Sequence, residues 1–245
     1  HGYSFLIAGF ILIIKTSDIL VDAASSLALK LKVPKMLIAL TIVSFGTCAP
    51  EIAISFQSVS KGDGQMAFAN VVGSCIVNVF LVLGLACFLR PIKVKHATIK
   101  KELPILVLVT TVFSVLMLDR LFNPLTRNSF SRAGIILILL FLVFVVYLVQ
   151  MLFHKPKEEE PQILFHPLVS LLFLAVSIVV IIFSSDLIVT SAKNIAYSLN
   201  ISEKIITMFA VVIGTSLPEM VMTVSSARKG EFDIAIGNII GTNIF

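Results

Sequence analysis

Residues 46–51 read Gly-Thr-Cys-Ala-Pro-Glu, and residues 214–219 read Gly-Thr-Ser-Leu-Pro-Glu. Both stretches lie within apolar sequence, and each ends in a glutamate that follows a proline. A proline loosens helical backbone because it has no N–H and clashes with the preceding turn. An ionisable side chain at membrane depth is costly, so it usually faces a cavity and has a function. The two stretches therefore predict a duplicated polar site inside an apolar protein.

The two stretches belong to a longer internal repeat. Residues 17–77 align with residues 185–245 without a gap, at a constant offset of 168, and 19 of these 61 pairs are identical. The identities include Gly, Pro, Glu, Asn and Lys, whereas chance matches between apolar helices are mostly Leu, Ile and Val. The sequence therefore indicates an internal duplication.

The composition is that of a membrane protein. Of the 245 residues, 58% are hydrophobic and only 13% are charged, compared with roughly 25% charged in a soluble domain. The three cysteines form no CxxC pair, which argues against a zinc site or a disulfide framework. The net charge of +5 is explained by basic loops, so we expect no nucleic-acid partner.

Eight apolar segments separate the charged clusters. They span residues 3–29, 34–60, 65–89, 103–118, 133–153, 167–199, 203–227 and 233–245. A helix needs about 20 residues to cross the hydrocarbon core. The last segment is shorter than that, so we expect the sequence to end within a helix.

Five helices separate the start of one copy from the start of the next, and an odd number inverts the second copy in the membrane. Such inverted repeats are common in secondary transporters, where they place a site near the middle of the bilayer. The predicted fold is an all-α polytopic membrane protein with two inverted-topology repeats of five transmembrane helices, the second truncated. We expect the first repeat at residues 1–153, a hydrophilic connection at 154–166 and the second repeat at 167–245.

Basic residues follow the first and third segments, which predicts that both of these loops are cytoplasmic and that the N-terminus is outside. They are Lys30, Lys32, Lys35, Arg90, Lys93, Lys95, Lys100 and Lys101. Asp18, Asp22 and Asp186 lie in the long helices that open the two repeats. We interpret these three as structural residues that cap a helix or pair with a lysine, rather than as part of an ion path.

Hydroxyl and amide side chains accompany the two glutamates. Thr47 and Glu51 are four residues apart, on one helix face, and Thr215 and Glu219 repeat this spacing. The adjoining polar residues are Ser216, then Asn70, Ser74 and Asn78 on the next helix, and Asn238 and Thr242 on its counterpart. Calcium takes six to eight oxygen ligands, and sodium also suits oxygen. Two carboxylates can balance one divalent cation or two monovalent ones, which is the physical basis for ion exchange.

These motifs resemble the two alpha-repeats of the cation/calcium antiporter superfamily, and most closely its prokaryotic sodium/calcium exchangers. The resemblance rests on residues 46–51 with 70–74 and on residues 214–219 with 237–245. It implies ten transmembrane helices, of which this chain holds eight. It further implies a secondary antiporter that exchanges calcium for sodium by alternating access, with both ions as substrates and no cofactor. We therefore expect a multi-pass protein of a prokaryotic plasma membrane, monomeric or weakly oligomeric in the lipid bilayer, that is not an enzyme.

By matching position, the resemblance assigns Thr47, Glu51, Thr215 and Glu219 to a central calcium site. It assigns Cys48, Ser74, Ser216 and Thr242 to sodium sites, with backbone carbonyls near Ser44 and Val212, and Asn78 completes the first half. Three positions depart from the family pattern: Cys48 replaces a serine, Cys75 an asparagine and Ala69 a glycine.

Other functions stay open from the sequence. A proton/calcium or potassium-dependent calcium exchanger would keep the fold and change the coupling ion, and Cys48 favours this reading because sulfur is a poor sodium ligand. An intramembrane enzyme could use the two carboxylates as acid and base, but the inverted repeat does not follow from that reading. A non-transporting membrane fragment is the remaining alternative.

Overall fold

The computed structural model describes residues 2–122, 130–153, 165–199 and 214–245, which form helices joined by short connections. In this part of the chain, five helical stretches are long and apolar enough to cross a membrane, and one further pair qualifies as a span bent by 49°. They are Tyr3–Leu31, Gly64–Leu89, His96–Leu118, Arg132–Leu152 and Pro167–Ser198, with the bent pair Lys35–Thr47 and Ala49–Ser60. These spans agree with the predicted all-α polytopic membrane fold.

Four of the first six predicted segments are unbroken helices. They are α1 (Gly2–Leu31), α8 (Glu102–Phe122), α9 (Phe130–Leu152) and α10 (Pro167–Ser198). Helix α8 is longer than predicted, and the short helix α7 (His96–Lys100) precedes it. The sequence analysis missed α7 because its histidine and lysines interrupt the apolar pattern on which the prediction depended.

The second and third predicted segments are broken helices. The second is divided into α2 (Lys35–Ile38), the π-helical turn η1 (Ala39–Val43), α3 (Ser44–Thr47) and α4 (Ala49–Ser60). The third is divided into α5 (Gly64–Ile76), the π-helical turn η2 (Val77–Val82) and α6 (Leu83–Leu89). Wide π-helical turns of this kind are frequent at functional sites.

The backbone of the second repeat matches that of the first at its special positions. Its described helices are α12 (Leu217–Lys229) and α13 (Phe232–Ile244). The residue before α4, Cys48, has φ −81° and ψ 5°, and its counterpart Ser216 before α12 has φ −88° and ψ 3°. The turns that follow these helices contain Gly62 and Gly230, both at φ +79°, where a side chain would be strained. The alignment of the two copies therefore extends to their backbone conformation.

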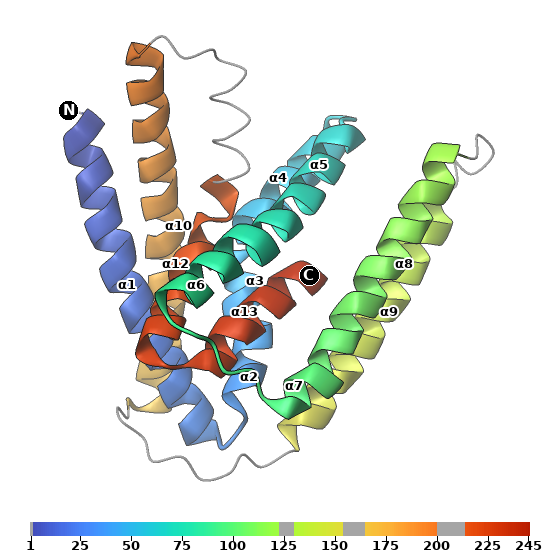
Figure 1. Cartoon of the computed structure of the whole chain (residues 1–245), viewed down its shortest axis with the longest axis horizontal. Coiled ribbons are helices and arrows are strands. Elements are labelled where there is room, and N and C mark those ends of the chain that lie inside the picture. The colour runs from blue at the N-terminus through green and yellow to red at the C-terminus, as the bar shows by residue number, and fades with distance from the viewer. Residues whose placement is uncertain (1, 123–129, 154–164, 200–213) are drawn as a thin grey trace.

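The helices form three groups in space (Figure 1). The long helices α1 and α10 pack along one another, and α8 and α9 form a hairpin on the other side of the molecule. The broken helices α4, α5, α12 and α13 lie between these two groups. The exposed large side chains of α1, α8, α9 and α10 are overwhelmingly apolar. This surface suits lipid, while the polar residues gather around the broken helices.

Helix α13 packs closely against η1 and α3 because two of its residues have no side chain. A Cβ atom at Gly237 would lie 2.6 Å from the Cβ of Ala39, and one at Gly241 would lie 2.2 Å from the Oγ of Ser44. The hydroxyl of Ser44 donates to the Ala39 carbonyl at 2.5 Å, and the backbone oxygen of Asn238 lies 3.2 Å from the same hydroxyl. The two glycines thus allow α13 to bring Asn238 next to the first repeat.

We expect Gly241→Ala to lower the thermal stability of the purified protein. The added methyl group would displace Ser44, and overpacking of this kind typically costs about 1–3 kcal/mol. Gly84→Ala is the matched control, because no atom lies within 4 Å of a Cβ placed there. The measurement is a melting curve read by size-exclusion chromatography in detergent. Equal melting temperatures for the two variants would contradict the proposed close packing.

Candidate functional site

The two glutamates occupy equivalent places, each as the third residue of a helix that begins at a break. Glu51 lies in the first turn of α4 and Glu219 in the first turn of α12. The prolines before them are therefore in first-turn positions, where a missing N–H breaks no hydrogen bond. The start of a helix carries partial positive charge, which favours a carboxylate there. The Pro-Glu pairs thus lie where a new helix begins, and the span that contains Pro50 bends by 49° at this break.

Both carboxyl groups are buried, and no basic side chain is buried with them in the described ranges. Glu51 is 9% exposed and Glu219 is fully buried. None of their four carboxylate oxygens has a hydrogen-bond partner of good geometry in the described part of the chain. The two groups lie near enough to interact electrostatically, and the buried residues of the described ranges include no lysine, arginine or histidine. Buried charges require a partner, so this arrangement fits a bound cation.

Each of the two predicted threonine ligands lies beside the glutamate of the other repeat. Thr215 of the second repeat lies beside Glu51, and Thr47 of the first repeat lies beside Glu219. Both threonines are buried. Each glutamate is therefore accompanied by a hydroxyl from the other repeat, an arrangement that requires the two halves to face each other at this point.

Two asparagines make matching hydrogen bonds. The amide nitrogen of Asn70 on α5 donates to the Glu51 carbonyl at 3.1 Å and to the Ser55 hydroxyl at 3.0 Å. The amide nitrogen of Asn238 on α13 donates to the Glu219 carbonyl at 3.5 Å and to the Thr223 hydroxyl at 3.2 Å. All these positions are related by the offset of 168. Each asparagine ties its helix to the first turn that carries the glutamate.

Asn238 has a further role, because its side-chain oxygen accepts a hydrogen bond from the Thr47 hydroxyl at 3.2 Å. Asn238 is completely buried and Thr47 is 1% exposed. This bond holds Thr47, a predicted ligand in the first repeat, against α13 of the second repeat. Asn70 and Asn238 were noted in the sequence as part of the oxygen-rich cluster, but their orienting role depends on contacts that only the structure reveals.

The remaining predicted site residues line the same region. The hydroxyl of Ser74 donates to the Val71 carbonyl at 3.0 Å, and that of Thr242 donates to the Asn238 carbonyl at 2.8 Å. With their protons engaged, these oxygens keep lone pairs for a cation. The Ser216 hydroxyl is fully buried and has no hydrogen-bond partner in the described ranges.

Cys48 and Asn78 complete the predicted set. Cys48 is buried, and its thiol lies within electrostatic range of both glutamates. The amide nitrogen of Asn78 donates to the side-chain oxygen of Asn243 at 3.0 Å and to the Thr242 hydroxyl at 3.4 Å. The oxygen of Asn78 is buried without a partner among the described residues. Val212, whose carbonyl the resemblance assigned to the site, lies outside the described residues.

Asn243 was missed in the sequence analysis. It occupies the repeat position of Cys75, and the asparagine expected at Cys75 by the family pattern is thus present in the second copy. Comparison of residues 241–243 with the Gly-Ser-Asn pattern would have identified it. The two repeats therefore differ here, with a thiol in one and an amide in the other.

The donor atoms are mainly oxygens from carboxyl, hydroxyl and amide groups. No group of three or more His, Cys, Asp or Glu side chains that could hold a metal ion occurs within the described ranges. Such groups are typical of zinc and copper sites, whereas neutral oxygens with a few carboxylates suit sodium and calcium. The donor atoms of this site are therefore of the types that sodium and calcium prefer.

Comparisons with known proteins identify this architecture. The family model described as "Sodium/calcium exchanger protein" matches residues 1–150 and 169–245. The chain is 32% identical to inner membrane protein YrbG of Escherichia coli, covering 99% of the chain and 75% of that protein. It is 29% identical to the sodium/calcium exchanger MaX1 of Methanosarcina acetivorans, covering 99% and 79%. A structure of the sodium-calcium exchanger NCX_Mj, soaked with Na⁺ and Sr²⁺, superposes with a TM-score of 0.82 at 29% identity, covering 99% and 77%.

We expect Asn238→Ala to weaken calcium binding by about 10–100-fold, the usual effect of removing a group that orients metal ligands. The substitution removes the acceptor for Thr47 and releases α13 from α12. The measurement is calorimetric titration of the purified protein with calcium. Asn194→Ala, at an exposed position of α10, is the control and should bind normally. Equal affinities in the two variants would contradict the orienting role of Asn238.

Proposed function

We propose that this chain, which belongs to the sodium/calcium exchanger protein family, is an antiporter. It would exchange sodium for calcium across a membrane. The observation that carries the proposal is the pair of buried glutamates from opposite repeats, whose oxygens have no hydrogen-bond partner of good geometry in the described part of the chain. Two negative charges with no basic side chain buried beside them in the described ranges create a site that is stable only when cations or protons occupy it. Exchange follows if the site opens to each side of the membrane in turn.

The proposed calcium ligands are Thr47, Glu51, Thr215 and Glu219, two from each repeat. Calcium would be neutralised by the two carboxylates and completed by hydroxyl and carbonyl oxygens. The proposed sodium sites lie around it, at Cys48, Ser74, Ser216 and Thr242, with Asn78 beside them. The Ser216 hydroxyl and the Asn78 oxygen are buried with no hydrogen-bond partner among the described residues, which supports their assignment as cation ligands.

The thiol of Cys48 affects which ion we expect to be exchanged for calcium. A thiol is a poorer sodium ligand than the serine hydroxyl usual in the family, so the first repeat offers one fewer strong ligand than the second. We propose that sodium is the coupling ion nonetheless, because the hydroxyls of Ser74, Ser216 and Thr242 remain. We further propose that the protein acts as a monomer or weak oligomer in a prokaryotic plasma membrane.

The test is uptake of radioactive calcium into proteoliposomes that hold the protein. With sodium inside and none outside, we expect rapid uptake. An outward proton gradient alone, at constant sodium, should give none. Uptake driven only by protons would overturn sodium coupling while leaving the site intact.

In the same assay, Glu51→Gln or Glu219→Gln should reduce the initial rate of calcium uptake by at least about 100-fold. Each substitution removes one of the two charges that balance calcium, and leaving a buried charge without its partner typically costs about 3–5 kcal/mol. Glu102→Gln is the control, since Glu102 is also buried but lies at the start of α8, where it accepts a hydrogen bond from Tyr147. Normal uptake by either site variant would refute the assignment of the ligands.

We propose that the N-terminus is outside. Lys35 pairs with Glu231 at 2.8 Å and Lys95 pairs with Asp233 at 2.7 Å. These contacts support the view that the basic loops after the first and third segments lie on the same face of the protein as the turn between α12 and α13. A face this rich in lysine and arginine is expected to be cytoplasmic.

Cysteine labelling in intact cells tests this orientation. In a protein with Cys75 and Cys87 replaced by alanine, Gln65→Cys should react with a membrane-impermeant maleimide, while Lys93→Cys should react only after the cells are lysed. Both positions are exposed, so accessibility within the protein does not limit either reaction. The reverse pattern would invert the proposed topology.

A further inference from the structure

Helix α10 packs directly against the two stretches of chain that lead into the site. Gly46 and Gly214 are the first residues of the two repeated motifs. A Cβ atom at Gly46 would overlap the side chain of Ile178, and one at Gly214 would lie 2.7 Å from a Cγ atom of Val189. Both contacts of α10 are therefore made at glycines, where the absence of a side chain lets the helix approach the backbone of the motifs.

Ser185 lies between these two contacts on the same face of α10. Ile178, Ser185 and Val189 are separated by seven and four residues, which is close to two turns and one turn of an α-helix. The side chain of Ser185 is only 4% exposed. It therefore faces the broken-helix core and not lipid.

The hydroxyl of Ser185 is not used by the described structure. A serine inside a helix commonly donates to the carbonyl three or four residues before it, and the neighbouring Ser184 does so to Val180 at 2.7 Å. The Ser185 hydroxyl is buried and has no hydrogen-bond partner in the described part of the chain. Burial of an unpaired hydroxyl is costly, so a ligand that this oxygen can bind would remove a penalty.

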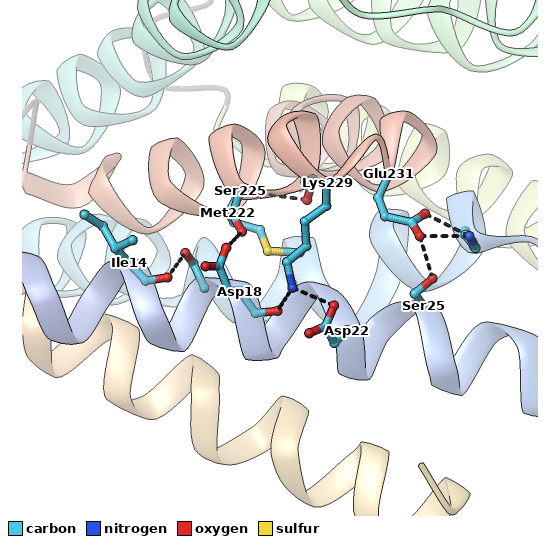
Figure 2. Close-up of polar contacts among 11 residues, drawn as sticks. Ile14, Asp18, Asp22, Ser25, Met222, Ser225, Lys229 and Glu231 are labelled. Atoms are coloured by element: carbon cyan, nitrogen blue, oxygen red, sulfur yellow. Dashed lines mark hydrogen bonds and ion pairs between the residues drawn. The ribbon is translucent and has the colours of Figure 1, made fainter. Parts of the chain in front are cut away.

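The internal repeat places a second serine at the equivalent position of α1. At the offset of 168, Ser185 corresponds to Ser17. Ser17 is 1% exposed, and its hydroxyl donates to the Ile14 carbonyl at 2.8 Å (Figure 2). The serine is thus present in both long helices, but its proton is engaged only in α1.

Helix α1 is also joined to α12 by polar side chains (Figure 2). The ammonium group of Lys229 donates to the Asp22 carboxylate at 2.6 Å, and the Ser225 hydroxyl donates to the Asp18 carboxylate. Asp18 and Asp22 therefore have structural partners, in agreement with the sequence interpretation, whereas Asp186 has none in the described ranges. No hydrogen bond or ion pair joins α10 to the broken helices within these ranges, so the polar group that α10 brings to the core is left without a protein partner.

A second unpartnered hydroxyl lies close to the contact between α10 and the second motif. Ser216 follows Gly214 by two residues, is fully buried and has no hydrogen-bond partner among the described residues. Val189, which touches Gly214, follows Ser185 by one helical turn. Hydroxyl oxygens add ligands without adding charge, so they suit a monovalent cation, while the two glutamates balance a divalent one.

We propose that the Ser185 hydroxyl is a sodium ligand that α10 supplies to the site, beside Ser216 of the second repeat. This inference rests on the proposed exchange function, in which sodium is the coupling ion. The repeated motifs provide the other proposed ligands, so Ser185 adds an oxygen from outside them. It contributes to the binding of sodium and not to the binding of calcium.

The test is displacement of radioactive calcium by sodium from the purified protein, measured by equilibrium dialysis in detergent. Ser185→Ala should raise the sodium concentration that displaces half of the calcium by about 3–10-fold, the effect expected for one lost contact of a neutral oxygen. Ser185→Thr keeps the hydroxyl and should restore the wild-type value. Calcium affinity measured without sodium should be unchanged in both variants, because the glutamates dominate calcium binding.

Two alanine variants of the same helix are matched controls. Ser184→Ala removes a hydroxyl that bonds to its own helix. Ser170→Ala removes a hydroxyl that is as buried and as unpartnered as that of Ser185, but it lies about 22 Å away along α10 by the helical rise. Both should respond to sodium as the wild type does. A shift in Ser170→Ala equal to that in Ser185→Ala, or an equal loss of calcium affinity without sodium in Ser185→Ala, would overturn the proposal.

Thermal melting separates a ligand from a packing residue. Without sodium, Ser185→Ala should melt no lower than the wild type, because the lost hydroxyl has no partner in the described structure. Added sodium should raise its melting temperature less than that of the wild type, since a ligand stabilises the folded protein according to its affinity. A lower melting temperature without sodium, with an equal gain from sodium, would refute the ligand role. If Ser185→Ala changes the sodium response but wild-type proteoliposomes take up no calcium, the exchange function fails and the ligand stands.

Discussion

The structure depends on two carboxylates that are buried among helices whose described buried residues include no basic side chain. Glu51 and Glu219 have no hydrogen-bond partner of good geometry for their carboxylate oxygens in the described part of the chain. The cost of such burial is large unless a counter-charge is bound. Several features of the fold serve this constraint: helix breaks place both groups in first turns, glycines admit α13, and asparagines fix the turns that carry the glutamates.

The broken helices allow polar backbone to exist at membrane depth. Breaks at Cys48 and Ser216 interrupt the usual helical hydrogen bonding, and such interruptions are tolerated in a bilayer only where protein or water surrounds them. Here α1, α10, α8 and α9 lie outside the broken helices (Figure 1) and present apolar side chains outward. The unbroken helices thus shield the polar centre from lipid, and the broken helices supply its ligands.

The two repeats make equivalent contacts around the glutamates but different contacts at the ends of the long helices. The hydrogen bonds of Asn70 and Asn238 are equivalent pair by pair, as ligands that face each other across a two-fold relation require. At the ends of the long helices, in contrast, the contacts of Asp18 and Lys229 have no formed counterpart at Asp186 and Lys61 in the described ranges. Part of this difference lies in the sequence, because the counterpart of Asp22 is Thr190, which cannot form an ion pair with Lys61.

The sequence by itself determined the membrane class, the duplicated motif and the two glutamates, because an apolar run of membrane length and a repeated Pro-Glu pair are local patterns. It also indicated Thr47 and Thr215, which share a helix face with these acids at a spacing of four. It did not identify Asn243 or α7, and it could not show that Thr47 bonds to Asn238 or that Lys229 pairs with Asp22. Those contacts join residues far apart in the chain, and they depend on how closely α13 approaches η1 and on how α1 packs against α12. Only the tertiary structure decides such distances, because they result from packing and not from the order of residues.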